Sequence, residues 1–299
     1  MDDIKVSVCI ITYNQEDFIR ECLDGAIKQT VDFNYEIVIG EDCSTDRTLQ
    51  ICKEYASAYP NLIKIFERPK NLGMTGNWIE SIQNCNGKYI ALCEGDDFWT
   101  DPLKLQKQVD FLESNPDYVM CFHAIDILKT DGSIIQDNIT SVPDNYEHIT
   151  TLARVGNYIH TPSVVFRNII KQFPVEFKIS PICDYLLYIM LAEQGKLKYL
   201  EQKMAIYREG VGVLSQRSLL KTFESSNKLY SCVISYLKDE GLKQLVFQKQ
   251  AQNLTHYFNL INSKEHLLSG NIFYKMIKYL SKNYNKPSRI FGKLKALNK

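Results

Sequence analysis

The chain lacks the long apolar runs of membrane-spanning proteins and the charge excess of nucleic-acid-binding ones. No apolar stretch in its 299 residues reaches the roughly 18 needed to span a bilayer. The 35 basic side chains equal the 35 acidic ones, which argues against nucleic acid as a bulk partner. Residues 1–5 have neither the basic nor the apolar region of a signal peptide. We therefore expect a cytoplasmic protein.

Motifs for zinc, for disulfide bonds and for direct phosphate binding are also missing. The nine cysteines are odd in number and form no C-x-x-C pair, so we expect reduced thiols buried in the core. No G-x-G-x-x-G follows the first expected strand, and no G-x-x-x-x-G-K-[ST] occurs. A dinucleotide fingerprint and a P-loop are thereby excluded. A bound phosphate would have to be held through a metal ion.

The most informative feature is an acidic cluster that follows a buried strand. The apolar run Lys88–Cys93 leads into Glu94, Asp96 and Asp97, and Asp101-Pro102 then signals the start of a helix. In open α/β sheets, ligands bind at the carboxyl ends of the strands. Clustered carboxylates repel one another unless a cation joins them, so a hard divalent ion with phosphates is the expected occupant.

Two further polar clusters follow strands of the same kind. The run Val6–Ile11 leads into Thr12–Glu16, and Tyr35–Ile39 leads into Glu41–Asp46. A third strand, 62–66, precedes residues 71–77, and helical patterns at 18–26, 48–59 and 78–82 follow the three strands in turn. The alternation predicts an α/β fold with a doubly wound, mostly parallel sheet flanked by helices.

The second half of the chain has a less regular pattern. Asp131-Gly132 predicts a hairpin turn, and the polar residues 136–150 predict a mobile loop that would act as a lid. From Ser218 onward the pattern is mostly helical, which predicts a carboxyl-terminal helical extension. The remaining elements that we expect are helices at 102–113 and 185–192, and strands at 118–123, 125–129, 163–166 and 197–200.

The order of these motifs resembles a known family. Val6–Asn14, Glu41–Asp46, Asn71–Gly73 and Glu94–Asp97 are similar to the successive nucleotide-sugar motifs of family 2 glycosyltransferases, which have the GT-A fold. Four such motifs in order within about 100 residues make a specific signal. Weaker likeness returns at three places further along, and it ends near residue 218. These three places are 161–167, 183–185 and 207–208.

The resemblance implies a division of the chain and a donor site. Residues 1–100 would form the nucleotide-sugar half and 101–215 the acceptor half of one catalytic domain, with 216–299 as the helical extension. Asp97 would bind Mn²⁺ or Mg²⁺ directly, and Asp96 would contact the ribose or the waters of the metal. Glu94 stands where the family usually has aspartate. The competing interpretation, in which these acids only cap the next helix, is weakened by the start signal at Asp101-Pro102.

The resemblance also assigns residues to the nucleoside. Asp42 would accept the N3–H of a uracil, which favours a UDP-linked donor. The other assigned residues are Thr12 and Glu16 as polar contacts, Tyr13 against the base, and Asn71. We expect Glu41 to order its loop and Asn14 to shape a turn, and we expect Ser44, Thr45 and Asp46 to cap the following helix.

A general base is needed to deprotonate the acceptor, and Asp184 matches the base of the family. It opens a helix, whose dipole favours the ionised form, although an ordinary helix-start charge would look the same. Arg208 in the Tyr-Arg pair would assist the diphosphate. The family often has a glutamate where this chain has Cys183, and a histidine after the arginine is missing. We expect His160 to be structural or to line the acceptor site.

These assignments predict a metal-dependent, inverting glycosyltransferase that acts on a glycan or lipid-linked acceptor in cell-surface polysaccharide synthesis. Two alternatives remain open: a nucleotidyltransferase, and a non-catalytic module that binds nucleotides or glycans. The segment 271–299 holds eight basic residues and no acid. It would either lie on an anionic membrane or pack as an ordinary helix, and the sequence supports both equally.

Overall fold

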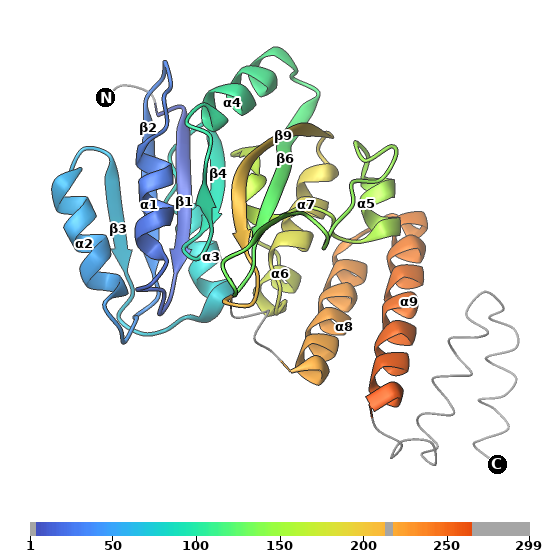
Figure 1. The fold of residues 1–299 in the computed structure, drawn as a ribbon. Helices are drawn as coiled ribbons and strands as arrows, with labels where there is room; N and C mark the ends of the chain where they lie inside the picture. The colour runs from blue at the N-terminus through green and yellow to red at the C-terminus, as the bar shows by residue number, and fades with distance from the viewer. Residues whose placement is uncertain (1–3, 213–217, 265–299) are drawn as a thin grey trace, which may run out of the picture.

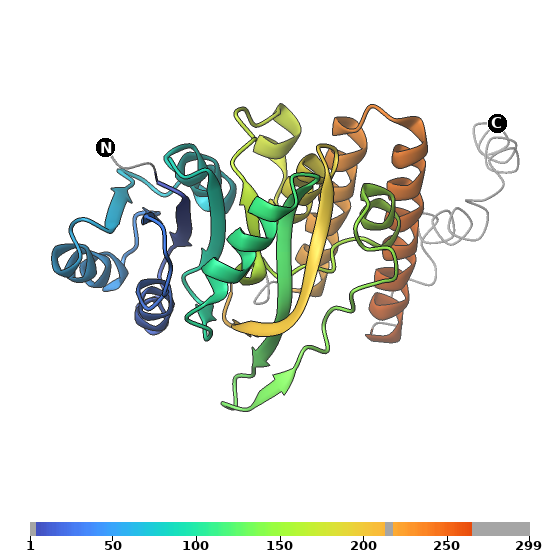
Figure 2. The ribbon, with the colours of Figure 1, turned by 90° about the horizontal axis from the view of Figure 1, so that it is seen from above.

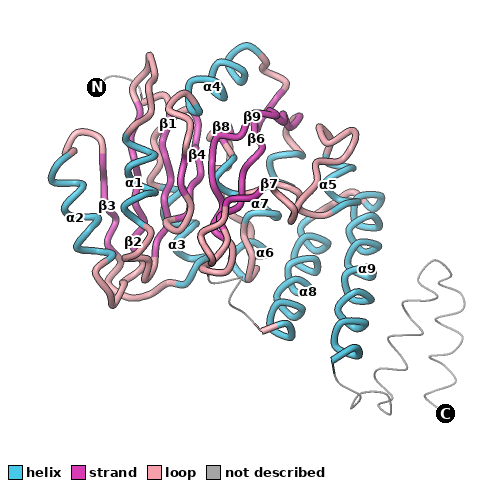
Figure 3. Tube along the Cα trace, in the orientation of Figure 1, coloured by secondary structure: helices cyan, strands magenta, loops and turns pink. Residues whose placement is uncertain are grey.

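The computed structural model describes residues 4–212 and 218–264, and one mixed sheet runs through the first of these ranges. Nine strands of the described residues form this sheet in the order β3-β2-β1-β4-β8-β6-β9-β5, with β7 added beside β6 (Figure 3). The strands are β1 (Val6–Thr12), β2 (Tyr35–Glu41), β3 (Ile63–Glu67), β4 (Tyr89–Glu94), β5 (Phe98–Trp99), β6 (Tyr118–Leu128), β7 (Ile134–Gln136), β8 (Val165–Arg167) and β9 (Lys196–Arg208).

The amino-terminal half is the parallel, doubly wound unit that the sequence predicts. β1 pairs in parallel with both β2 and β4, and β2 pairs in parallel with β3. The crossover helices are α1 (Ile19–Ile27), α2 (Thr48–Ala58) and α3 (Gly73–Gln83). α3 begins five residues before the expected 78–82 helix, since Gly73 supplies a left-handed backbone conformation, φ +75°, that favours glycine.

The second half makes the sheet mixed. β8 is antiparallel to both β4 and β6, whereas β6 and β9 are parallel to each other. The two strands expected at 118–129 are one continuous strand, β6, and β9 is much longer than the expected 197–200. The hairpin at Asp131-Gly132 is confirmed, because β6 and β7 pair antiparallel across it. The long pairing of β6 with β9 extends the sheet well beyond the parallel unit (Figure 1).

Helices cover both faces of the sheet (Figure 2). Val8 and Ile10 of β1 join one core cluster with the apolar faces of α1, α2 and α4 (Lys104–Ser114). Cys9, between them in the strand, belongs to the opposite cluster with α3 and the later helices. This alternation follows from the two-residue period of a strand. The later helices are α5 (Ile149–Val155), α6 (Val175–Ile179), α7 (Asp184–Ala192), α8 (Leu219–Tyr236) and α9 (Glu240–Lys264).

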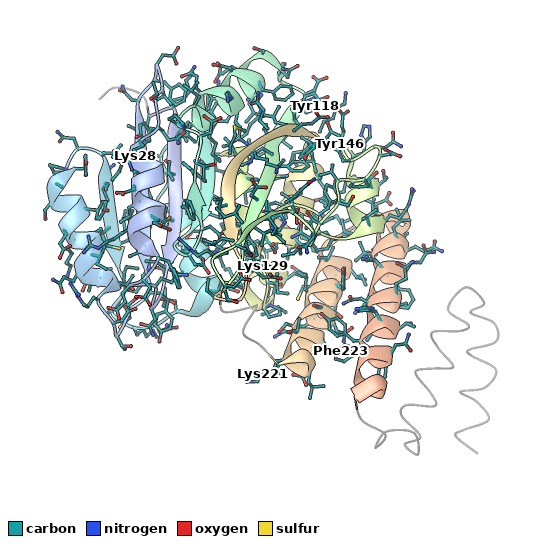
Figure 4. The ribbon with its side chains drawn as sticks, in the orientation of Figure 1. Lys28, Tyr118, Lys129, Tyr146, Lys221 and Phe223 are labelled. Atoms are coloured by element: carbon teal, nitrogen blue, oxygen red, sulfur yellow. The ribbon has the colours of Figure 1, made fainter. Side chains whose placement is uncertain are left out.

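The helical extension packs against the domain. α8 contacts α6 and α7, and α9 contacts α5 and α8 (Figure 1). Phe223 of α8 meets the ring of Tyr257 of α9 at 5.5 Å and lies between the two helices (Figure 4). Within the described ranges, no helix is both long and apolar enough to cross a bilayer. The basic segment 271–299 lies outside the described residues, so its two interpretations stay predictions.

The segment expected to be a mobile lid has defined contacts. Asp137 accepts hydrogen bonds from the Ile139 N–H at 2.8 Å and from the Thr140 hydroxyl at 2.6 Å. Helix α5 begins inside the predicted loop, at Ile149. The segment lies over the second half of the sheet, and its mobility stays a prediction.

We predict that Gly25→Ala destabilises the protein by about 1–3 kcal/mol. A Cβ at Gly25 would lie 2.7 Å from the carbonyl oxygen of Trp99, so α1 would be pushed off β5. Helix propensity alone would make the change stabilising by about 1 kcal/mol, so the sign tests the contact. Urea unfolding measures the difference in the free energy of unfolding. The control is Ser57→Ala, at an exposed position of α2. A variant more stable than the parent would contradict this packing.

Candidate active site

Three carboxylates converge where β4 ends. Glu94 is the last residue of β4, and Asp96 and Asp97 lie in the turn that leads to β5. One oxygen from each lies within 4.8 Å of the others. Asp97 is only 1% exposed, and its Oδ1 accepts a hydrogen bond from the Arg208 backbone N–H at 2.9 Å. Its buried Oδ2 has no partner among the described residues. An unpaired, buried carboxylate oxygen beside two other acids is a ready ligand for a cation.

The pKa values of these carboxyl groups also indicate a cation site. Burial raises the pKa of Asp97 well above its usual value, and the charges of Asp96 and Glu94 add to the effect. Burial also raises the pKa of Glu94, with Asp96 and Asp184 contributing. A divalent ion would relieve both the desolvation and the mutual repulsion, and three carboxylates suit Mn²⁺ or Mg²⁺. The residues therefore fit a divalent metal.

The cluster borders a cavity of about 260 Å³, here called the donor cavity. It lies at the sheet edge where β1, β2 and β4 end. Six of the residues predicted from the sequence line it: Thr12, Tyr13, Asp42, Asn71, Glu94 and Asp96. The structure thus brings together side chains from four separate motifs.

Asp42 is buried and accepts a hydrogen bond from a neighbouring loop. Its Oδ1 accepts a hydrogen bond from the Leu72 N–H at 2.7 Å, and Asn71 Oδ1 accepts one from the Gly73 N–H at 2.9 Å. Asp42 therefore ties the loop after β2 to the turn before α3. Burial raises the pKa of Asp42, and the hydrogen bond from Leu72 works against that rise. Tyr13 is 37% exposed at the cavity.

Glu16 lies outside the donor cavity and joins two loops. Its Oε2 accepts a hydrogen bond from the Arg47 N–H at 3.1 Å, and its own N–H donates to Asp46 Oδ2 at 3.1 Å. Its assigned contact with the nucleoside therefore has no counterpart among the residues that line the cavity.

The expected helix caps at Ser44 and Thr45 are wrong. Both residues bond to Asn14, whose left-handed backbone, φ +51°, shapes the turn after β1 as expected. Of the three, only Asp46 bonds to the first turn of α2, where its Oδ1 accepts a hydrogen bond from the Thr48 N–H at 2.9 Å. These side chains join two neighbouring loops, which sequence spacing could not reveal. Glu41 orders its own loop, as expected, by accepting from the Ser44 N–H at 2.9 Å.

Arg208 contributes its backbone to the site and turns its side chain away. Its guanidinium lies over the rings of Phe18 and Phe98, at 5.1 and 4.9 Å, and forms an ion pair with Glu21 of α1. Its predecessor Tyr207 lines the donor cavity instead. In this arrangement the guanidinium is held by α1, and contact with a diphosphate would require that ion pair to open.

A second cavity, here called the transfer cavity, adjoins the first and has a volume of about 250 Å³. Glu94, Met74 and Tyr207 line both cavities. Asp184, the first residue of α7, and His160 line the transfer cavity. The two cavities meet at Glu94.

Asp184 is positioned by two hydrogen bonds, one of them from the exposed side chain of Asn157. Its Oδ2 accepts from Asn157 Nδ2 at 2.8 Å, and its Oδ1 accepts from the Tyr185 N–H at 2.7 Å. Burial raises its pKa, which makes the ionised form a stronger base. Trp78 also lines the transfer cavity, and its buried Nε1–H has no partner.

Sequence reasoning missed three of these residues. Trp78 looked like part of an ordinary apolar helix face, and Asn157 lay in a segment without pattern. Tyr207 was visible only as the neighbour of Arg208. No short motif marks residues that face a cavity from separate elements.

Comparison with known proteins identifies the family. The glycosyl transferase family 2 profile matches residues 7–173, which is more than half of the chain. The chain therefore belongs to glycosyltransferase family 2, as the four motifs predicted.

The chain also resembles individual proteins in sequence and in fold. The chain is 39% identical over 204 residues to the uncharacterized protein Rv1520 of Mycobacterium tuberculosis, a match that covers 68% of this chain and 58% of that protein. The TarS structure from S. aureus with UDP-GlcNAc aligns with a TM-score of 0.61 at 19% identity, over 93% of this chain and 79% of that one.

The mannosyltransferase PcManGT from Pyrobaculum calidifontis, with GDP-Man and Mn²⁺, aligns with a TM-score of 0.57 at 14% identity. That alignment covers 99% of this chain and 86% of the other. These likenesses confirm the GT-A fold.

We predict that Mn²⁺ stabilises the protein through Asp97. At 100 times its dissociation constant, the ion would add about 2.7 kcal/mol. Asp97→Asn should abolish most of this gain, because it removes a charge while an amide oxygen can still accept from the Arg208 N–H. Thermal unfolding with and without Mn²⁺ measures the effect. The control is Asp110→Asn, at an exposed position of α4. Equal stabilisation of all three proteins would rule out Asp97 as a ligand.

Proposed function

We propose that this protein transfers a sugar from a nucleoside-diphosphate sugar to a hydroxyl group of a glycan or lipid-linked acceptor. One observation carries the proposal: the donor cavity, which the acidic cluster borders through Glu94 and Asp96, and the transfer cavity, which contains Asp184, meet at Glu94. A donor held in the first cavity would present its sugar toward the second. A surface-polysaccharide role at the inner face of the plasma membrane is part of the same proposal.

The donor half would hold the diphosphate through a divalent ion. Asp97 offers its unpaired Oδ2, and Asp96 and Glu94 complete the set of oxygen ligands. An ion bound there would neutralise the charge of the departing diphosphate. Asp42 would read the base, and its carboxylate suits the N3–H of uracil, so we propose a UDP-linked donor.

The acceptor half would supply the base. The Asp184 carboxylate takes the proton of the acceptor hydroxyl as that oxygen attacks the anomeric carbon. The new bond between the anomeric carbon and the acceptor oxygen forms as the bond to the phosphate oxygen breaks, and the nucleoside diphosphate leaves. The attack comes from the face opposite the leaving group, so the configuration is inverted. The hydrogen bond from Asn157 fixes the direction in which Asp184 points.

The two rival functions differ in measurable ways. A nucleotidyltransferase would need a glycine-rich, basic loop after β1 to hold a triphosphate, and Thr12–Arg20 has one basic residue and no glycine. A non-catalytic module would bind the nucleotide sugar without turnover. Donor hydrolysis or transfer that stops when a chelator is added would support the enzyme. Binding without any turnover across a panel of nucleotide sugars would support the module.

We predict that Asp184→Asn separates binding from catalysis. Turnover should fall about 10²-fold or more, the usual scale for a lost general base, because an amide cannot take the proton. Donor affinity should stay near the parent value, since Asp184 lies in the transfer cavity. Calorimetry and an assay of released UDP measure the two quantities, with Asp144→Asn as a surface control. Weaker donor binding with unchanged turnover of bound donor would place the base elsewhere.

We predict that Asp42→Asn weakens UDP binding about tenfold or more, the scale of a lost hydrogen bond to a charged group. The amide oxygen can still accept from the Leu72 N–H, so the loop should keep its shape. Binding of inorganic pyrophosphate, which lacks a base, should be unchanged and serves as the control. If UDP and pyrophosphate weaken together, Asp42 acts on the diphosphate or on the fold, not on the base.

A further inference from the structure

A third cavity of about 250 Å³ lies beyond the transfer cavity and is here called the outer cavity. Its walls come from β6, from β9 and from the segment 136–142. Thr140 and His160 line both the outer and the transfer cavity, so the two are neighbours. The three cavities thus follow one another in space from the donor, past Asp184, to the outer cavity. Of the single residues that were given a role from the sequence, His160 alone lines the outer cavity.

The charged groups around the outer cavity are already paired. Lys203 Nζ lies 2.6 Å from Asp126 Oδ1, and His160 Nε2 lies 3.0 Å from Asp137 Oδ2. Hydrogen bonds from His160 and Thr140 hold the pKa of Asp137 below its usual value against the effect of burial. The lysine and both acids therefore have partners within the described part of the protein. A phosphate or another anion would have to compete for them, so the chemistry favours a neutral ligand.

His123 is among the residues that line this cavity, but its ring nitrogen Nε2 is buried out of reach of a ligand. The side chain is 3% exposed, and Nδ1 lies 2.7 Å from the Ala124 carbonyl oxygen. A carbonyl oxygen only accepts, so Nδ1 carries the proton. Burial lowers the pKa of His123 well below its usual value, which keeps the ring neutral. Its Nε2 is then a lone-pair acceptor that has no partner among the described residues, but it is buried away from the cavity surface, so the ligand makes no contact with it.

Aromatic rings supply the rest of the wall. Tyr199 and Tyr158 line the outer cavity and pack against Phe122, with ring centroids 5.3 and 6.0 Å apart. Tyr146, beside β9 and α5 in Figure 4, closes this cluster behind Tyr199 at 6.0 Å. Neutral polar groups beside a fixed aromatic surface suit a sugar ring, which has hydroxyl groups on its edge and C–H groups on its faces.

We propose that the outer cavity binds the neutral sugar residue next to the one that accepts the transferred sugar. The acceptor is then a glycan of at least two sugars that occupies the transfer and outer cavities together. This inference rests on the proposed function, because it takes the transfer cavity as the acceptor site.

The test compares disaccharides with the corresponding monosaccharides. The full-length protein, with UDP and Mn²⁺, would be titrated by NMR with maltose, cellobiose, lactose and N,N′-diacetylchitobiose, and with the methyl glycosides of their non-reducing sugars. Ser141→Trp places an indole among the residues at the exposed mouth of the outer cavity. Ser114→Trp, at the exposed end of α4, is the matched control. Lys203→Ala is a second variant that opens the wall instead of blocking it.

At least one disaccharide should bind about tenfold or more tightly than its methyl glycoside, the scale of one added subsite. Ser141→Trp should abolish that advantage, Lys203→Ala should reduce it, and Ser114→Trp should preserve it. UDP affinity should be unchanged in all variants. The inference would be overturned if disaccharides and methyl glycosides bound with equal affinity, or if a protein that binds UDP bound no disaccharide. It would also be overturned if Ser141→Trp weakened the binding of both classes of sugar equally. Absence of metal-dependent UDP binding would instead contradict the proposed function.

Discussion

The parallel pairing of β1 with β2 and β4 is the constraint on which the whole site depends. In the register of these strands, Thr12 lies opposite Glu41, and Ile11 lies opposite Glu94. Three loops rich in oxygen ligands therefore leave the sheet at one edge, within reach of one another. Backbone bonds reinforce this edge, since the Asp42 N–H donates to the Thr12 carbonyl and the Gly95 N–H donates to the Ile11 carbonyl. A shift of one residue in this register would separate the carboxylates from the loop that carries Asp42.

The same arrangement opposes folding in the absence of a ligand. Buried acids with raised pKa values, and an Asp97 oxygen without a partner, cost free energy that the packed core has to offset. Such local costs are typical of functional sites, where a bound ion or substrate relieves them. The hydrophobic clusters on both faces of the sheet supply the compensation. Site and core are therefore coupled through β4, whose apolar residues are buried and whose last residue is Glu94.

The mixed half of the sheet forms walls of the two cavities that follow the donor cavity. β8 joins β4 to β6 in antiparallel pairing, and the long β9 carries Tyr207 back to the acidic cluster. The transfer and outer cavities form between these strands, α7 and the segment that precedes α5. Residues from distant parts of the sequence, such as Asn157 and Asp184, are hydrogen-bonded there. The geometry around the transfer and outer cavities is thus a product of long-range pairing.

The sequence by itself determined the parallel unit, the acidic cluster and the family, because alternating strands and helices with polar strand ends are local patterns. It also predicted six residues that line the donor cavity. Only the tertiary structure decided that Glu16 joins two loops, that the guanidinium of Arg208 faces α1, and that Tyr207 and Trp78 face the cavities. It likewise decided the unpaired state of His123 Nε2. The physical reason is that a side chain's partner across the sheet depends on strand register and helix packing, which sum over many distant contacts and leave no signature in a short motif.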